Sequence, residues 1–188
     1  MSASFAYDGV GRRRSKNVNG AATNFLYDGI NLVQEQSGGG TPTANLMVGL
    51  GIDETLLRTD VTGTSAMLVD ALGSTIALAD ASAALTTQYT FEPFGAASWT
   101  GTASTNALQF SGRENDGTGM YSFRARYPDS ALGQFISEDP IGPSVGDSNL
   151  YRYVMSNPIG RIDPVPTEKA VPVDAVDVAP NRGYASRR

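Results

Sequence analysis

Aspartates in the last third of the chain are the residues best suited to chemistry. Asp139 and Asp163 each precede a proline, and Asp147 lies between them. Two carboxylates within about 3 Å of each other cannot both ionise easily, so one stays protonated and can act as an acid. Such a pair can activate water against a peptide bond. The alternative is a structural role, because aspartate before proline is a common turn starter.

The absence of two residue types narrows the chemistry further. The chain contains no cysteine and no histidine. The first absence excludes disulfides, thiolate nucleophiles and cysteine-ligated metals, and the second removes the usual general base near pH 7. Any reaction must use carboxylates, hydroxyls, lysine, arginine or backbone groups. We expect no cofactor and no metal.

Charge and hydropathy exclude two classes of partner. The net charge of −5 argues against a nucleic-acid binder that relies on its overall field. An apolar run of about 18 residues, as a membrane span requires, does not occur. The first residues lack the charged and apolar regions of a signal peptide, so none is expected.

Two charged stretches have a functional and a structural interpretation. The basic run Arg12–Lys16 could touch an acidic partner, but a strand with its polar side chains in solvent is favoured, with Arg13 on the face opposite Arg12 and Arg14. The stretch Glu114–Gly119 offers oxygen ligands for Ca²⁺. It lacks the ligand spacing of an EF-hand loop, so we interpret it as a turn.

The spacing of turn residues predicts an all-β fold. Glycine, asparagine, aspartate and proline recur at intervals of roughly eight to twelve residues, which is typical of short strands joined by tight turns. The unit Phe5–Gly9 recurs as Phe25–Gly29, with alternating aromatics, an acid and a glycine. An acid in this position can accept hydrogen bonds from backbone N–H groups two residues on. Two such units predict stacked antiparallel hairpins.

Period-two alternation predicts further strands. One runs from Leu46 to Ile52, with Leu46, Val48, Leu50 and Ile52 on one face. Another runs from Tyr121 to Tyr127, with the aromatics on one face and Arg124 and Arg126 on the other. The stretch Asp70–Ser74 predicts a hairpin turn. Residues 149–155 fit either a short helix or a strand.

Residues 120–163 contain four distinctive sequence motifs in a fixed order. They are Met-Tyr-Ser-Phe-Arg-Ala-Arg-Tyr, Gly-Gln-Phe-Ile-Ser-Glu-Asp-Pro-Ile-Gly, Asn-Leu-Tyr-Arg-Tyr-Val-Met-Ser-Asn-Pro and Ile-Asp-Pro. This order resembles the RHS repeat-associated core domain that closes RHS/YD-repeat proteins, and the Phe5 and Phe25 units resemble YD repeats. The core-motif residues of this resemblance are Tyr121, Arg124, Arg126, Tyr127, Phe135, Asn149, Tyr151, Asn157 and Pro158.

The resemblance implies a fold and four regions. The expected fold is an all-β antiparallel meander of YD-type hairpins running into a core plug, followed by a disordered or loosely docked tail. Residues 1–36 would be YD-repeat-like hairpins, 37–119 further shell hairpins, 120–164 the core-motif region and 165–188 the tail. The tail, 165–188, is too short to build a folded catalytic domain, so we expect no toxin domain of its own.

The resemblance also implies a site. Family members are understood to cut their own chain just beyond a final Asp-Pro-x-Gly motif, using aspartates of the core. By position Asp139 matches the catalytic region and Asp147 is the weaker candidate for its partner, while Asp163, Pro164 and Val165 match the cleavage region. Here Pro166 replaces the motif's glycine, which stiffens the turn. We therefore do not expect an enzyme, with a residual aspartyl self-protease as the alternative.

The function that the resemblance implies is structural. The chain would be a shell or plug segment of a bacterial RHS-type toxin-delivery protein, secreted or at the cell surface. Its partners would be other shell segments, a toxin segment, or a second copy paired through exposed strand edges. The alternatives are a cell-surface adhesion module of YD-repeat type and an aspartyl self-cleaving core.

Overall fold

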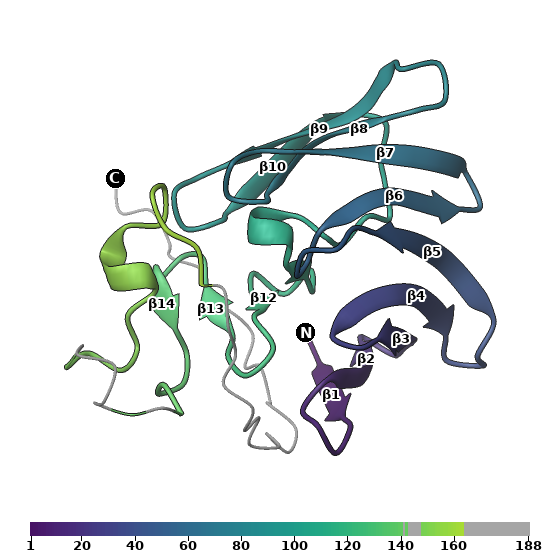
Figure 1. Cartoon of the computed structure of the whole chain (residues 1–188). Helices are drawn as coiled ribbons and strands as arrows, with labels where there is room; N and C mark the ends of the chain where they lie inside the picture. The colour runs from purple at the N-terminus through teal and green to yellow at the C-terminus, as the bar shows by residue number, and fades with distance from the viewer. Residues whose placement is uncertain (141, 143–147, 164–188) are drawn as a thin grey trace, which may run out of the picture.

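The computed structural model describes residues 1–140, 142 and 148–163. The fold is all-β, as the sequence predicts, and consists of a ten-stranded antiparallel sheet with a second segment packed inside its curve (Figure 1). Each strand pairs with the next along the chain, so the sheet is a simple meander from β1 to β10. We call the described residues after Gly101 the inner segment. The expected tail, residues 165–188, lies outside the described residues.

The strands of the large sheet are β1 (Ala3–Tyr7), β2 (Arg13–Val18), β3 (Ala21–Asp28), β4 (Asn31–Ser37), β5 (Pro42–Val48), β6 (Thr55–Asp60), β7 (Gly63–Val69), β8 (Thr75–Ala79), β9 (Leu85–Phe91) and β10 (Ala97–Gly101). The inner segment holds the 3₁₀ turns η1 (Phe110–Gly112) and η3 (Val154–Ser156) and the short strands β11 (Glu114–Asn115), β12 (Tyr121–Ser122), β13 (Pro128–Asp129) and β14 (Gln134–Phe135). No helix in the described part is long and apolar enough to cross a membrane.

Aspartates close several of the hairpins. The Oδ1 atom of Asp8 accepts hydrogen bonds from the backbone N–H groups of Val10 (3.0 Å) and Arg12 (2.9 Å). Asp70 binds the N–H groups of Leu72 and Ser74 in the same way, at 2.9 and 2.8 Å. This confirms the predicted role of the acid after Tyr7 and the predicted turn between β7 and β8, because a short acidic side chain satisfies N–H groups that the turn leaves unpaired.

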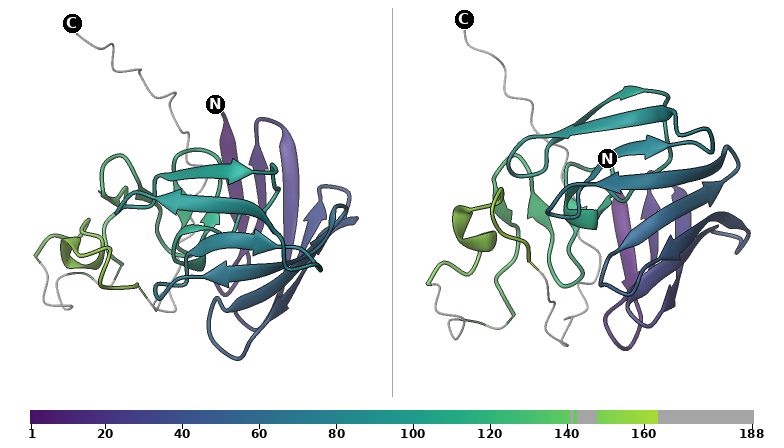
Figure 2. Two further views of the ribbon diagram at one scale, coloured as in Figure 1. Left: turned by 90° about the horizontal axis from the view of Figure 1, so that it is seen from above. Right: turned by 45° about the horizontal axis from the view of Figure 1, so that its top comes forward.

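Register shifts bend the sheet into a half-shell. They occur between Ala6 and Tyr7, between Leu26 and Tyr27, and in most of the following strand pairs. A β-bulge bends its strand and increases the local twist, so a bulge in pair after pair curls the sheet. Figure 2 shows the resulting concave face, with the inner segment seated against it.

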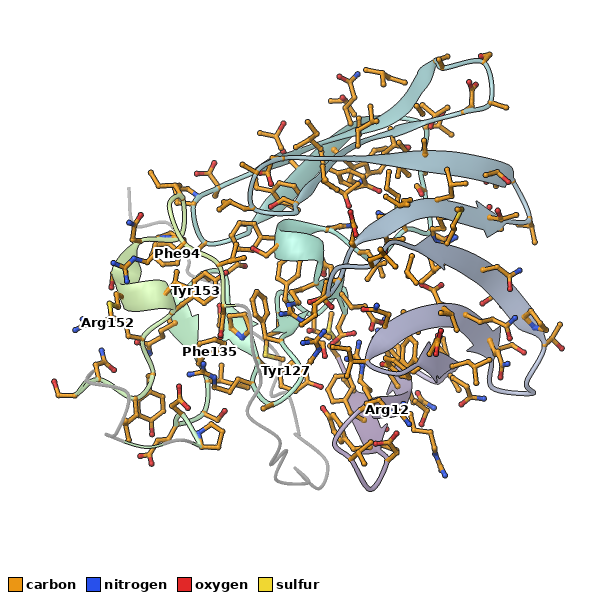
Figure 3. The ribbon with its side chains drawn as sticks, in the orientation of Figure 1. Arg12, Phe94, Tyr127, Phe135, Arg152 and Tyr153 are labelled. Atoms are coloured by element: carbon orange, nitrogen blue, oxygen red, sulfur yellow. The ribbon has the colours of Figure 1, made fainter. Side chains whose placement is uncertain are left out.

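Two apolar clusters join the inner segment to the sheet. The first contains Leu46, Met67, Leu78 and Tyr89 of the concave face together with Leu108. The second consists of inner-segment aromatics, packed against Phe91 and Phe94: Phe110, Tyr121, Phe123, Phe135 and Tyr153. Figure 3 shows Phe135 and Tyr153 turned toward each other, and their rings meet edge to face with centroids 5.6 Å apart.

Two expected strands are shorter than the alternation predicts. Strand β5 ends at Val48, and Leu50 and Ile52 lie in the following turn, where both are exposed. Strand β12 ends at Ser122, since Arg124 has a φ of 57° and the chain folds back so that Phe123 bridges Arg126. The alternation of burial nevertheless holds there, because Tyr121, Phe123 and Tyr127 are all buried.

Candidate functional site

One guanidinium brings together two of the aspartates singled out in the sequence. The NH1 atom of Arg126 lies 2.8 Å from Oδ2 of Asp139, and its NH2 atom lies 3.0 Å from Oδ2 of Asp163. All three side chains are largely buried, with exposed fractions of 14%, 15% and 22%. The two carboxylates therefore meet across a cation.

Local structure holds each of the three residues in place. The guanidinium of Arg126 lies 3.7 Å from the centroid of the Phe135 ring, a cation–π contact that fixes its plane. The backbone of Asp139 is anchored by its N–H bond to the carbonyl of Leu150 at 2.9 Å. The carbonyl of Asp163 accepts a hydrogen bond from Arg113 at 3.1 Å.

A small cavity of about 220 Å³ opens beside this group. It is lined by Arg126, Asp139 and Asp163, and also by Asn149 and Arg161. The Arg161 guanidinium contacts the sulfur of Met155 at 2.9 Å. The cavity offers room beside the acids for a short piece of chain or for water.

The geometry consists of two ion pairs on one guanidinium. Here Oδ2 of each aspartate faces a separate nitrogen of Arg126. The sequence identifies Arg126 as a core-motif residue. The structure shows that it connects Asp139 and Asp163.

Three of the predicted site residues cannot be compared with this geometry. Asp147, Pro164 and Val165 lie outside the described residues. The partner that the structure gives Asp139 on the same guanidinium is Asp163, which sequence reasoning assigned to the cleavage region. Asp139 and Asp163 are far apart in the sequence, and no local pattern links them. Their proximity is therefore apparent only from the folded structure.

The remaining core-motif residues fall into a buried and an exposed set. Tyr121, Tyr127, Phe135 and Pro158 are buried. Asn149, Tyr151 and Asn157 are exposed, and Asn149 caps a turn by accepting the N–H of Tyr151 at 3.1 Å. Tyr151 is 38% exposed and does not pack in the apolar core, whereas Tyr153 is 2% exposed and belongs to the second apolar cluster. Residues 149–155 form neither a regular strand nor an α-helix: Arg152 makes a single β-bridge with Gln134, and the short 3₁₀ element η3 begins at Val154.

A second charged group fastens the inner segment to the first strands. Arg13 of β2 pairs with Glu114 and with Asp116, the latter at 2.6 Å. Lys16, on the same strand, binds Glu114 at 2.6 Å and Asp116 at 3.2 Å. The expectation that the basic run faces solvent is wrong for Arg13, which is 4% exposed, while the predicted alternation holds because Arg14 is exposed.

Burial and pairing act in opposite directions on this group. Burial alone would raise the pKa of Glu114, but Arg13 and Lys16 hold it below its usual value. Burial raises the pKa of Asp116 above its usual value, with Arg13 opposing and Glu114 adding to the effect. Burial disfavours a charge on Lys16, yet the two carboxylates raise its pKa.

The interpretation of Glu114–Gly119 as a turn holds for the end of that stretch, where the N–H of Gly117 donates a hydrogen bond to the side-chain oxygen of Asn115.

Aromatic contacts continue this junction. The ring of Tyr127 stacks on Phe5 with centroids 5.2 Å apart, and its hydroxyl hydrogen-bonds that of Tyr7. Figure 3 shows Tyr127 on the side of the inner segment that faces β1. Within the described residues, no cluster of three or more acidic side chains is arranged to hold a metal ion.

Comparison with known proteins finds sequence similarity to several toxin proteins. No family model matches the chain. It is 32% identical over 171 residues to the tRNA3(Ser)-specific nuclease WapA of Bacillus spizizenii, a match that covers 86% of this chain and 7% of that protein. It is 38% identical over 71 residues to the toxin subunit YenC2 of Yersinia entomophaga, covering 38% of this chain and 7% of the subunit.

Solved structures share the fold. The chain superposes on TcdB2-TccC3 with a TM-score of 0.68 at 23% identity, covering 86% of this chain and 9% of that one. It superposes on the Photorhabdus luminescens Tc holotoxin pore with a TM-score of 0.69 at 22% identity, covering 86% and 8%. The sequence relatives and the shared fold support an RHS-associated, toxin-related protein. The chain spans only 7% of the WapA relatives.

Proposed function

We propose that this chain is a wall-and-plug segment of the shell of a secreted RHS-type toxin-delivery protein. Strands β1–β10 would form a stretch of the wall, and the inner segment would be the plug. The observation that carries this proposal is the double attachment of the inner segment to the concave face: an apolar cluster around Leu108 and the buried ion pairs of Arg13 and Lys16.

The β1 edge supports a place within a longer wall. Strand β1 has β2 on one side only among the described residues. A sheet edge presents unpaired N–H and C=O groups that accept a further strand. We infer that preceding shell strands pair with β1, while the curve of β1–β10 closes over the inner segment.

A chimera tests this role. The matching segment of the tRNA nuclease WapA of Bacillus subtilis, to which the chain is 31% identical over 182 residues, would be replaced by this chain. We expect the chimera to keep the protease resistance of its C-terminal part, as a closed shell requires. A matched deletion of the segment is the control. A chimera as sensitive as the deletion would reject the proposal, and attachment of the isolated chain to cells would favour the adhesion alternative.

Self-cleavage is a second candidate, favoured by the convergence of Asp139 and Asp163 on Arg126. Its test restores the ending that the resemblance implies, through Pro166→Gly with Thr167→Leu. If the acids are competent, this variant is cut near residue 167 and the added change Asp139→Asn stops the cut. An intact double variant would remove the candidate, whatever the outcome for the shell.

A further inference from the structure

A larger cavity lies between the first strands of the sheet and the inner segment. Its volume is about 620 Å³, which is within the usual range of roughly 300–1,000 Å³ for ligand sites. It is separate from the group around Arg126, Asp139 and Asp163, none of which lines it. The turns that follow β1, β3 and β5 form one side of it.

Apolar side chains at this cavity are left uncovered. Val10, Ile30 and Ile52 all line it, and their exposed fractions are 72%, 48% and 51%. Three large apolar side chains from three separate turns meet at one hollow. Apolar side chains gathered in this way mark a surface that binds another chain.

Two arginines at the cavity share one ion-pair partner. Arg113 and Arg124 both pair with the single carboxylate of Asp53, at 2.9 and 2.7 Å. The Nε atom of Arg113 is buried and has no hydrogen-bond partner. Burial, with the neighbouring Arg124, lowers the pKa of Arg113, while Asp53 opposes the shift. The carboxylate of Asp163 also raises the pKa of Arg113, and a further carboxylate facing the cavity would give Arg113 and Arg124 separate partners.

The chain itself leads to this cavity. Arg113 lines the cavity and also donates a hydrogen bond to the carbonyl of Asp163, at 3.1 Å, so Asp163 lies next to a wall residue. The sequence after Asp163 includes Val171–Val178, which reads Val-Pro-Val-Asp-Ala-Val-Asp-Val. At roughly 3.3 Å per extended residue, Val171 can lie up to about 26 Å from Asp163, a sufficient reach.

We propose that the cavity is a docking site for residues Val171–Val178 of the same chain. The valines would cover Val10, Ile30 and Ile52, and the carboxylate of Asp174 or Asp177 would face Arg113 and Arg124. The chemistry required of the occupant is an extended peptide that combines small apolar side chains with isolated carboxylates, which this segment provides.

Paired cysteines test the docking, because the chain has no cysteine of its own. One full-length variant carries Ile52→Cys with Val173→Cys. The matched control carries Met47→Cys with Val173→Cys; Met47 is 57% exposed, close to the 51% of Ile52, and neighbours the inward Leu46. Under mild oxidation at low protein concentration, we expect the intramolecular disulfide to form at least about tenfold faster in the Ile52 pair.

A charge change supplies a second, independent readout. Adding Asp174→Asn and Asp177→Asn to the Ile52 pair should slow disulfide formation by about threefold, as expected for a partly exposed ion pair. Equal rates for the Ile52 and Met47 pairs would overturn the proposal. So would a disulfide that forms only between two chains. Because the substituted residues Ile52 and Met47 are exposed, unchanged thermal unfolding is expected in both variants.

Discussion

Asp139 and Asp163 bind opposite nitrogens of one guanidinium, at 2.8 and 3.0 Å. This contact closes the inner segment on itself, because Asp139 follows β14 and Asp163 follows η3. It also gives each acid a cationic partner. A role in stabilising the inner segment and a role in self-cleavage would both depend on Arg126, Asp139 and Asp163.

The wild-type chain should remain uncut. Val165–Pro166 replaces the flexible turn that the resemblance implies. Intact-mass measurement after days at about pH 5–7 should return the full 19.8 kDa chain. A product ending between residues 164 and 170 would contradict this expectation.

Removing a buried inner-segment aromatic should destabilise the protein strongly. Phe135 is 1% exposed, so Phe135→Ala should lower the free energy of unfolding by about 3–5 kcal/mol. Tyr151 is the matched control: it is 38% exposed, and Tyr151→Ala should change stability by about 0.5 kcal/mol or less. Urea unfolding compares them, and similar losses for both would refute the assignment of the core.

Substitutions at the neighbouring residues Arg13 and Arg14 should have very different effects on stability. Arg13→Met leaves Glu114 and Asp116 with one cation fewer in a buried place, which should cost about 3–5 kcal/mol. Arg14 is exposed, and Arg14→Met should be close to neutral. If thermal melts of the two variants coincide, the buried ion pairs do not hold the inner segment to β2.

Glu35 gives a pH dependence with a defined sign. Burial raises its pKa above the ordinary 4.5, although Arg58 at 2.9 Å opposes the shift. The folded state then binds more protons than the unfolded state, so this group's contribution to stability falls as pH rises from about 4.5 through the raised value. The change Glu35→Gln should remove that fall. Urea unfolding between about pH 4 and 7 measures it, and parallel pH profiles for both proteins would argue against it.

The isolated chain should self-associate through its sheet edges. All five residues of β10 are exposed, including Trp99 at 53%, and exposed edges pair with other chains. Light scattering should show dimers or larger species, and Trp99→Lys should reduce them because a charge on an edge strand opposes pairing. A wild-type monomer at high concentration would contradict this.

The sequence predicts the local elements well and the contacts between distant elements poorly. The alternation of Phe5 and Tyr7 and the acid at Asp8 are enough to predict β1 and its turn, because both depend on neighbours along the chain. The inward orientation of Arg13 depends on Glu114, which no local pattern links to it. For the same reason the pairing of Asp139 with Asp163 through Arg126 was not predicted.

Leu50 and Ile52 show a second limit. Both fit an alternating pattern, yet both are exposed, because strand β5 ends at Val48. A bulge or a left-handed residue such as Arg124 shifts which side chains face the core. Alternation therefore identifies the apolar residues of a region more reliably than the face each one occupies.

Electron cryo-microscopy of the chimera with Bacillus subtilis WapA tests the wall-and-plug assignment most directly. The account predicts a strand of the preceding shell paired with β1, and the inner segment seated on the concave face with Arg13 against Glu114 and Asp116. An unpaired β1 at the outside of the particle, or an inner segment displaced from the concave face, would contradict it.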